Sequence, residues 1–547
     1  MSLQFIIGSS GSGKSCYAYQ NIIEQAGLHP EKLFFVIVPE QFTMQTQKTL
    51  VEMSPGKGIL NIDILSFERL AYRVLEEVGG DSRTLLEETG KSMVLQKMVQ
   101  QHGKELSYLG GQMRKAGYLD EVKSILSEFM QYDIRDSEIQ EMIEDSSDRA
   151  LLQMKLKDVS VLYQAFTGYL KDHYMTGEEV MDALEKALPF SRKMKNSVLL
   201  LDGYTGFTPI QMRVVGELLA VCEKVMVTVT MDAAENLSTR GKPYQLFYMS
   251  RQMIHRLSEL TREIEEPVLL KDVRKSRFSQ APALHFLEKN IFRYRKNVYK
   301  KKQDEICMFS ATSPLKEMEE TARRIARLVR EKDCRYGEIA VITGNLEEYG
   351  NLAKQVFTAA GIPYFIDEKH TVLMNPFVEY FRAALEMAVQ DFSYESVFRY
   401  LRCGMSCVTR EEADLLENYV LALGIRGFKK WDEVWVRIYR GMPPENIQRL
   451  NEIRERFADE TRELALSFKG GKKTVREYCT ILYEFALKSQ VQQKLKHQEL
   501  KFKEQGDKAM EKEYAQIYGI VMELLDNMVE ILGEETVSRQ DFRQLLE

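Results

Sequence analysis

The sequence predicts an α/β protein with two α/β units, each carrying large helical insertions. Near the start of the chain, an apolar stretch at 3–7 leads into a glycine-rich loop and a helical pattern at about 14–25. A second strand–helix–strand pattern covers 305–344. Strands that alternate with helices at these spacings are typical of parallel sheets, so we expect one such sheet in each unit.

The first unit is expected to span residues 1–275. Short apolar runs typical of buried strands recur along it, and helical patterns separate them. These runs lie within 32–40, 61–70, 197–203 and 224–230. A stretch at about 87–186 carries apolar residues at helical spacing and interrupts the series. We therefore predict a helical insertion within one α/β domain.

The second unit is expected to span residues 276–547. Strands are predicted at 305–311 and 338–344, with an amphipathic helix at about 314–331 between them. From about residue 380 the pattern is almost wholly helical, which predicts a second helical insertion. The last residues, VSRQDFRQLLE, have a helical pattern that no Gly, Asn or Pro closes. We expect this domain to be truncated and the chain to be a fragment.

Composition narrows the class of protein. The 547 residues carry a formal net charge of -6, which is not the basic balance of a typical nucleic-acid-binding domain. The seven cysteines are scattered, which favours a reducing compartment, and Cys403 and Cys407 lack further Cys or His ligands for a metal site. The chain has neither a secretory leader nor a run of about 18 apolar residues, so we expect a cytoplasmic protein without a membrane span.

The glycine-rich loop has the pattern G-x-x-x-x-G-K-S, which is typical of nucleotide phosphate binding. The predicted cofactor is ATP with Mg²⁺, because loop N–H groups cradle phosphates, the lysine meets the outer phosphates and the serine hydroxyl ligates the metal. The predicted cofactor-binding residues are Gly8, Ser9, Ser10, Gly11, Ser12, Gly13, Lys14 and Ser15. The alternative is a glycine-rich structural turn, but a strand precedes the loop and a helix follows it, as phosphate binding requires.

A phosphate loop needs an acidic partner at the end of another buried strand. The stretch SVLLLDG supplies Asp202, so Ser15 and Asp202 are the predicted metal-site residues. A simple turn Asp before Gly203 is the alternative. Motor ATPases usually carry a Glu directly after this Asp, and here Gly203 stands in its place. We expect nucleotide binding without the usual hydrolytic carboxylate, and we assign no catalytic residue.

A basic segment lies between the two predicted units. Residues 271–302 hold eleven Lys or Arg against two acidic residues, with Phe and Tyr interleaved. Cations neutralise phosphates and aromatic rings stack on unpaired bases, so this segment is a candidate DNA contact. Its candidate residues are Arg293, Arg295 and Lys296. A solvated linker helix with a buried aromatic stripe remains the alternative.

An ordered set of segments resembles the AddB family, the B subunits of ATP-dependent helicase/deoxyribonucleases. The segments include GSSGSGKS, FVIVPEQFTMQTQ, ILSFERLAYRVL, LLLDGYTGFTPIQ, YGEIAVITGN, GIPYFIDEKHTVLMNPFVEYFRAAL, FRYLRCGM and LENYVLALGIRGFKKW. The resemblance implies two RecA-like domains of the superfamily 1 helicase type. It also implies a heterodimer with an AddA-type subunit that processes double-strand DNA ends for recombinational repair. Within this heterodimer, the present chain would be a degenerate motor that binds and scans a DNA strand.

The chain departs from the family pattern in one respect. Family members are longer, and their C-terminal half carries a nuclease domain and the cysteines of a [4Fe–4S] cluster. This chain ends before that region, so neither nuclease carboxylates nor cluster ligands are assigned, and we do not expect the chain alone to cleave DNA. Two alternatives remain, a P-loop small-molecule kinase and a static ATP-binding scaffold. DNA binding and nucleotide turnover distinguish them from the helicase-like function.

Overall fold

The computed structural model describes residues 2–79, 83–113, 116–236, 239–271, 276–293, 296–367 and 371–546. The chain divides into two compact units. One comprises Met1–Asp272 and Val372–Glu547, and the other comprises Val273–Thr371. The C-terminal helices, which were expected in the second unit, belong by their contacts to the first.

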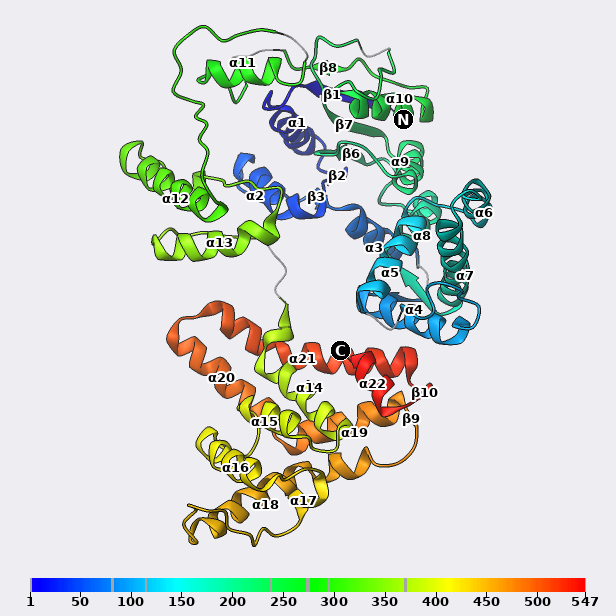
Figure 1. Ribbon diagram of the computed structural model, residues 1–547. Helices are drawn as coiled ribbons and strands as arrows, with labels where there is room; N and C mark the ends of the chain where they lie inside the picture. Colours follow the sequence, from blue (N-terminus) through cyan, green and yellow to red (C-terminus); the bar gives the residue numbers. More distant parts are fainter. Residues whose placement is uncertain are drawn as a thin grey trace. The chain divides into compact units, whose positions relative to one another are not determined.

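The first unit is built on a six-stranded parallel sheet with the order β3-β2-β6-β7-β1-β8 (Figure 1). Its strands are β1 (Ser2–Gly8), β2 (Phe34–Ile37), β3 (Ile62–Leu65), β6 (Val198–Leu201), β7 (Lys224–Thr230) and β8 (Val268–Leu269). The strands predicted in this part of the sequence are confirmed. In a parallel sheet all carboxyl ends lie at one edge, so the loops after β1, β2, β6 and β7 meet there.

Both faces of this sheet are buried, which explains why its strands are apolar runs rather than alternating patterns. Phe35 and Ile37 belong to the hydrophobic cluster on one face, whereas Phe34 and Val36 belong to the cluster on the other. Helix α1 (Lys14–Leu28) contributes Ala18, Tyr19, Ile22 and Ala26 to the second of these clusters. The remaining elements that flank the sheet are η1 (Glu40–Phe42), α2 (Thr43–Met53), α3 (Phe67–Val78), α9 (Pro209–Val221) and α10 (Tyr248–Leu260).

The helices predicted within about 87–186 are present between β3 and β6. They are α4 (Glu88–His102), α5 (Ala116–Gln131), α6 (Asp136–Asp145), α7 (Ala150–His173) and α8 (Gly177–Ala187), followed by η2 (Leu188–Phe190). A two-stranded parallel sheet of β4 (Thr84–Leu86) and β5 (Tyr174–Thr176) accompanies them. Helix α8 packs against α3 and α9, which ties this insertion to the main sheet.

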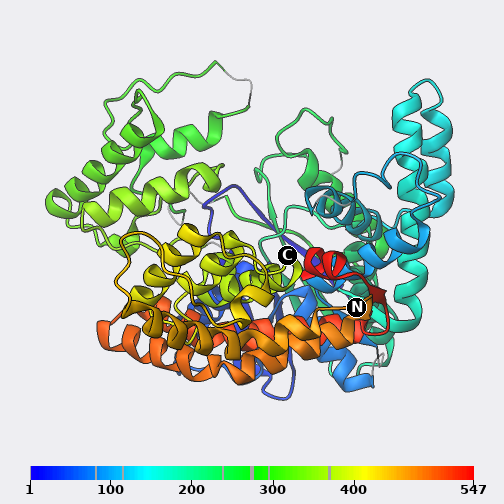
Figure 2. The ribbon, with the colours of Figure 1, turned by 60° about the horizontal axis from the view of Figure 1, so that its bottom comes forward.

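Residues 372–546 form a second group of helices within the same unit. They are η5 (Val372–Met374), α14 (Pro376–Val389), α15 (Tyr394–Arg402), α16 (Arg410–Leu423), α17 (Phe428–Asp432), α18 (Asn446–Ser467), α19 (Val475–Lys488), α20 (Val491–Gln505), α21 (Lys508–Leu532) and α22 (Arg539–Leu546), with the short strands β9 (Lys473–Thr474) and β10 (Thr536–Val537). Helices α20 and α21 lie side by side (Figures 1 and 2). Helix α4 packs against α21, so these helices share one hydrophobic core with the insertion. None of the helices in the described ranges combines the length and apolar character that a membrane crossing requires.

The second unit contains α11 (Pro282–Asn290), α12 (Pro314–Glu331), η4 (Tyr336–Glu338) and α13 (Leu346–Ala359). Helices α12 and α13 pack on each other through Met318, Ile325 and Phe357 (Figure 1). The strands predicted at 305–311 and 338–344 are wrong for this structure, because neither segment pairs with another strand among the described residues. An apolar pattern indicates which side chains a strand would bury, but a strand also needs neighbours for its backbone N–H and C=O groups.

Candidate nucleotide-binding site

The predicted phosphate loop lies at the carboxyl edge of the sheet, between β1 and α1. Gly11 and Gly13 have φ angles of 72° and 89°, in the left-handed region that glycine adopts without strain. A Cβ atom at Gly8 would lie 2.2 Å from Ser12 Oγ. Backbone conformation therefore favours glycine at Gly11 and Gly13, and a close approach of the Ser12 side chain favours it at Gly8.

The loop presents unsatisfied donors. Helix α1 begins without a side-chain cap and without an acidic residue in its first turn. The first N–H groups of a helix have no partner within the helix, and its N-terminus favours anions. Ser12 Oγ is buried and has no hydrogen-bond partner among the described residues. Lys14 Nζ donates to Ser9 O at 3.0 Å, so its ammonium group lies over the loop. These features fit a bound phosphate chain.

Asp202 is the point where three hydroxyl groups converge. Ser15 Oγ donates to Oδ1 at 3.1 Å, and Thr228 Oγ1 donates to the same oxygen at 2.6 Å. Tyr19 OH donates to Oδ2 at 2.6 Å. Asp202, Tyr19 and Thr228 are all buried. Burial, with the charge of Asp202 as a second cause, raises the pKa of Tyr19, so the phenol keeps its proton and acts as a donor.

The sequence explains how these groups meet. Asp202 follows β6, and the pairing of Leu201 with Val227 brings it beside Thr228 of β7. Ser15 and Tyr19 are four residues apart on α1 and therefore share one helix face. Sequence reasoning found Ser15 and Asp202 but missed Tyr19 and Thr228. The signals were present, since Tyr19 is one helical turn after the motif and Thr228 interrupts a run of apolar residues.

Gly203 adopts a φ of 83°, which a residue with a Cβ atom adopts only with strain. Its N–H donates to Thr228 Oγ1 at 3.4 Å. A Cβ atom there would contact Pro39 Cδ at 3.5 Å, so space alone does not exclude a side chain. The residue at the position where motor ATPases carry Glu thus has a backbone conformation that favours glycine.

The DNA-contact candidates lie in the other unit. The side chain of Arg293 is 8% exposed, and its Nη2 lies 3.5 Å from Glu288 Oε1. Lys296 is exposed, as are Lys300, Lys301 and Lys302. Arg295 lies outside the described residues. Of the candidates, only Lys296 is placed by the structure with its ammonium group open to a ligand.

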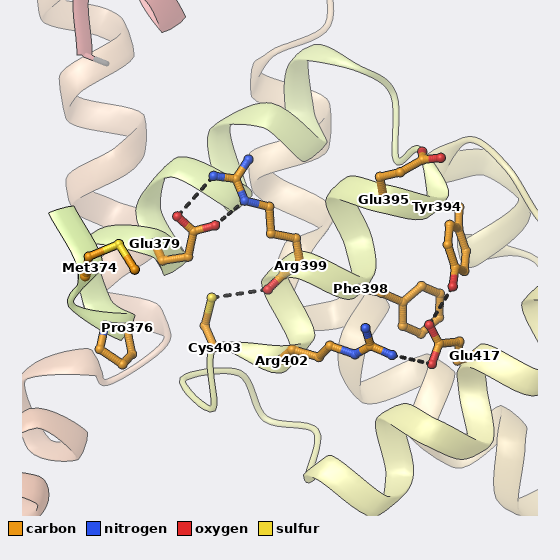
Figure 3. Close-up of a pocket in the computed structure, with 10 residues that line it drawn as sticks. All are labelled: Met374, Pro376, Glu379, Tyr394, Glu395, Phe398, Arg399, Arg402, Cys403 and Glu417. Atoms are coloured by element: carbon orange, nitrogen blue, oxygen red, sulfur yellow. Dashed lines mark hydrogen bonds and ion pairs between the residues drawn. The ribbon is translucent and has the colours of Figure 1, made fainter. Parts of the chain in front are cut away.

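A cavity of about 530 Å³ lies among the C-terminal helices, lined from α14, α15 and α16 (Figure 3). Arg399 pairs with Glu379, and Arg402 lies 2.6 Å from Glu417. Because both guanidinium groups face carboxylates, this cavity does not favour a phosphate. Burial raises the pKa of Cys403, which also lines it, to about 12, so the thiol stays protonated at neutral pH.

The described residues contain no group of three or more His, Cys, Asp or Glu side chains arranged to hold a metal ion. A Mg²⁺ that accompanies a nucleotide does not need such a group. It retains water and takes oxygens from the phosphates, with one or two protein ligands. Ser15, with Asp202 behind it, suits this role.

Comparisons with known proteins point to one family. The family described as "ADDB, N-terminal" matches residues 5–288. The chain is 41% identical over 557 aligned residues to the B subunit of the ATP-dependent helicase/deoxyribonuclease of Lachnoclostridium phytofermentans, with 100% of this chain and 48% of the relative covered. The corresponding subunits of Caldanaerobacter subterraneus and Clostridium novyi are 34% and 33% identical, again over 100% of this chain and 48% of the relative. The chain therefore spans about half the length of the curated relatives it matches.

Proposed function

Because the chain belongs to the AddB family, we propose that it forms the helicase-like, ATP-binding part of a B-type subunit. With an AddA-type partner, that subunit would process double-strand DNA ends for recombinational repair. The names of the relatives, which describe a helicase/deoxyribonuclease, support this proposal. The intact relatives are about twice as long as the matched region, so nuclease activity belongs to the proposal for the whole protein only.

The observation that carries the nucleotide part of the proposal is the convergence of the phosphate loop and Asp202. In the proposed complex, loop N–H groups and Lys14 hold the phosphates. Ser15 would offer its hydroxyl oxygen to Mg²⁺, while the same hydroxyl donates a hydrogen bond to Asp202. When bound, the metal would neutralise phosphate charge. This residue set recurs in motor ATPases and in small-molecule kinases alike, so the support for a helicase-like function comes from the family and not from the loop.

We propose that this nucleotide is turned over slowly. Gly203 stands where a base would activate the attacking water, and its φ of 83° is a conformation unsuited to Glu. One alternative acid after a strand beside β6 is Glu40, which follows Pro39 three residues after the end of β2. Its carboxylate lies 2.9 Å from Arg69, so that charge is already engaged. A degenerate motor that binds a strand accounts for this arrangement.

The second RecA-like domain is also a proposal, supported by exposed apolar segments in the smaller unit. Met308, Ile342 and Phe365 are 92%, 93% and 89% exposed. Soluble domains rarely leave so many large apolar side chains together in solvent. Ile339 and Ile366 of these segments pack on the hydrophobic cluster of α12 and α13, whereas Ile342 and Phe365 line a cavity beside it. We expect the segments to become strands when residues outside this chain supply their neighbours.

Equilibrium binding tests the proposal. The chain is expected to bind a fluorescent ADP in the presence of Mg²⁺, and separately to bind a labelled single-stranded oligonucleotide. A chain that binds nucleotide but no DNA would contradict the helicase-like function and return the kinase to consideration. A chain that binds DNA but no nucleotide would contradict the assignment of the phosphate loop.

A further inference from the structure

The hydroxyl group of Tyr19 occupies a distinct place in the nucleotide site. It donates to Asp202 Oδ2 at 2.6 Å, on the oxygen that neither Ser15 nor Thr228 contacts. The contact of the same hydroxyl with Thr46 Oγ1 is longer, at 3.4 Å. Tyr19 is 6% exposed and Asp202 is 5% exposed, so water has little access to this hydrogen bond.

We propose that Tyr19 is a positioning residue that acts through Asp202 and Ser15 on the Mg²⁺ accompanying the nucleotide. This inference rests on the proposed function. A carboxylate turns about its Cβ–Cγ bond, and donors on both oxygens fix that rotation. With Oδ2 held by Tyr19, Oδ1 faces Ser15 and accepts a hydrogen bond from its hydroxyl. The remaining lone pairs of Ser15 Oγ then point away from Asp202 and are available to the metal.

Loss of the phenol oxygen would disturb this arrangement of hydrogen bonds. In a buried site, Oδ2 would be left without a partner, which is costly for a charged group. The carboxylate would rotate to share the donors that remain on Oδ1. Ser15 would then be held less firmly, and the metal would lose part of its preorganised ligand. Contacts to the phosphates from the loop and Lys14 do not pass through Tyr19, so metal-free nucleotide binding should not change.

The test is Tyr19→Phe, which keeps the ring in its hydrophobic cluster and removes one oxygen. The affinity for a fluorescent ADP is measured in EDTA and in Mg²⁺, and the ratio of the two dissociation constants gives the gain from the metal. We expect the affinity in EDTA to stay as in the parent chain. The gain from Mg²⁺ should fall by about tenfold, the effect of one hydrogen bond to a charged group.

Tyr17→Phe is the matched control, since Tyr17 lies on the same helix but is 38% exposed. It should leave both affinities unchanged. In Asp202→Asn, adding Tyr19→Phe should cause no further loss of the metal gain, because Tyr19 acts through that carboxylate. Heat denaturation of each variant confirms that binding is measured on folded protein.

Two results would overturn the inference. An unchanged gain in Tyr19→Phe would show that the hydroxyl does not act on the metal. Equal losses in EDTA and in Mg²⁺ would show that it only supports the fold of α1. Failure of the proposed function is a separate outcome, because it appears in the parent chain as an absence of nucleotide binding before any substitution is made.

Discussion

Ser15 Oγ donates a hydrogen bond of 3.1 Å to Asp202 Oδ1, across 187 positions of sequence. The contact joins the start of α1 to the end of β6, which is two strands away from β1 in the sheet. It brings together a hydroxyl of the predicted phosphate loop and the acidic group that phosphate and metal binding there would require. The helices inserted between Ser15 and Asp202 in the sequence therefore do not disturb the arrangement of residues at the carboxyl edge of the sheet.

The first prediction concerns the phosphate loop. Lys14→Ala should weaken ADP binding by about 10- to 100-fold, because hydrogen bonds to charged groups contribute roughly 1.5–3 kcal/mol. The side chain contacts the loop carbonyl of Ser9 rather than a hydrophobic core, so the fold should survive. Fluorescence titration with ADP and thermal denaturation measure the two effects. Lys57→Ala, an exposed lysine of the same unit, is the control. Unchanged affinity in a folded Lys14→Ala variant would refute the assignment.

The second prediction concerns turnover. The chain should hydrolyse ATP slowly even with single-stranded DNA, since a positioned base typically supplies about 10²–10⁴-fold in rate. Gly203→Glu should not restore the rate. The positive φ should instead make both Gly203→Glu and Gly203→Ala less stable by about 1–2 kcal/mol. Phosphate release assays and denaturant melts measure these outcomes.

The result that would contradict slow turnover is also specific. Strong DNA-stimulated hydrolysis by the parent chain would require another carboxylate. Glu40 is one candidate, because it follows β2, a strand beside β6. Loss of that activity in Glu40→Gln, with ADP affinity retained, would identify it as the base and exclude a degenerate site.

The third prediction concerns the stability of the helical insertion, in which an ion pair joins α4 to α8. Lys91 on α4 is 4% exposed and donates to Glu88 and Glu178, each at 2.9 Å. Removal of one partner from a buried ion pair costs about 3–5 kcal/mol because the other charge stays buried. Lys91→Ala should therefore lower the free energy of unfolding, measured by chemical denaturation. The loss should be somewhat smaller than about 3–5 kcal/mol, because Glu88 is exposed and its charge stays solvated. Lys48→Ala, in an exposed pair with Glu52, should change stability by less than about 0.5 kcal/mol.

The same ion pairs give a pH dependence. Burial lowers the pKa of Lys91, but the hydrogen bonds to Glu88 and Glu178 outweigh it, and the pKa rises above 10.5. A raised pKa in the folded state adds stability below the unfolded value, and that stability is lost as the pH rises through the folded pKa. The parent chain and Lys91→Ala should therefore differ most in stability at neutral pH and converge above about pH 10.5. A difference that grows with alkaline pH would contradict this assignment.

The sequence allowed the parallel sheet of the first unit to be predicted because its strands are uninterrupted apolar runs, such as Phe34–Ile37, that only burial on both faces explains. The strands at 305–311 and 338–344 were not predictable in the same way. Their apolar pattern is equally clear, but pairing depends on neighbours that sequence periodicity does not reveal. The position of Arg293, buried beside Glu288, was likewise invisible in a run of charges that is typical of solvated surface.

The last prediction concerns DNA. If the basic segment binds a strand, reversing Lys296, Lys300 and Lys301 to Glu should weaken binding, because these side chains are exposed and their replacement leaves the packing of the unit unchanged. Removal of each phosphate-binding cation should also reduce the slope of log affinity against log salt by about 0.9 on duplex DNA or 0.7 on single strands. Affinity is measured by anisotropy at several salt concentrations.

The control for this prediction reverses the same number of charges elsewhere. Lys57, Lys104 and Lys429 are exposed lysines of the larger unit, and their reversal to Glu changes the net charge equally. A general loss of attraction would lower affinity similarly in both variants. Phosphate binding at the basic segment would instead lower the salt slope in the first variant only. Equal slopes in the parent chain and both variants would identify the segment as a connector, and the strand would have to bind another surface of the protein.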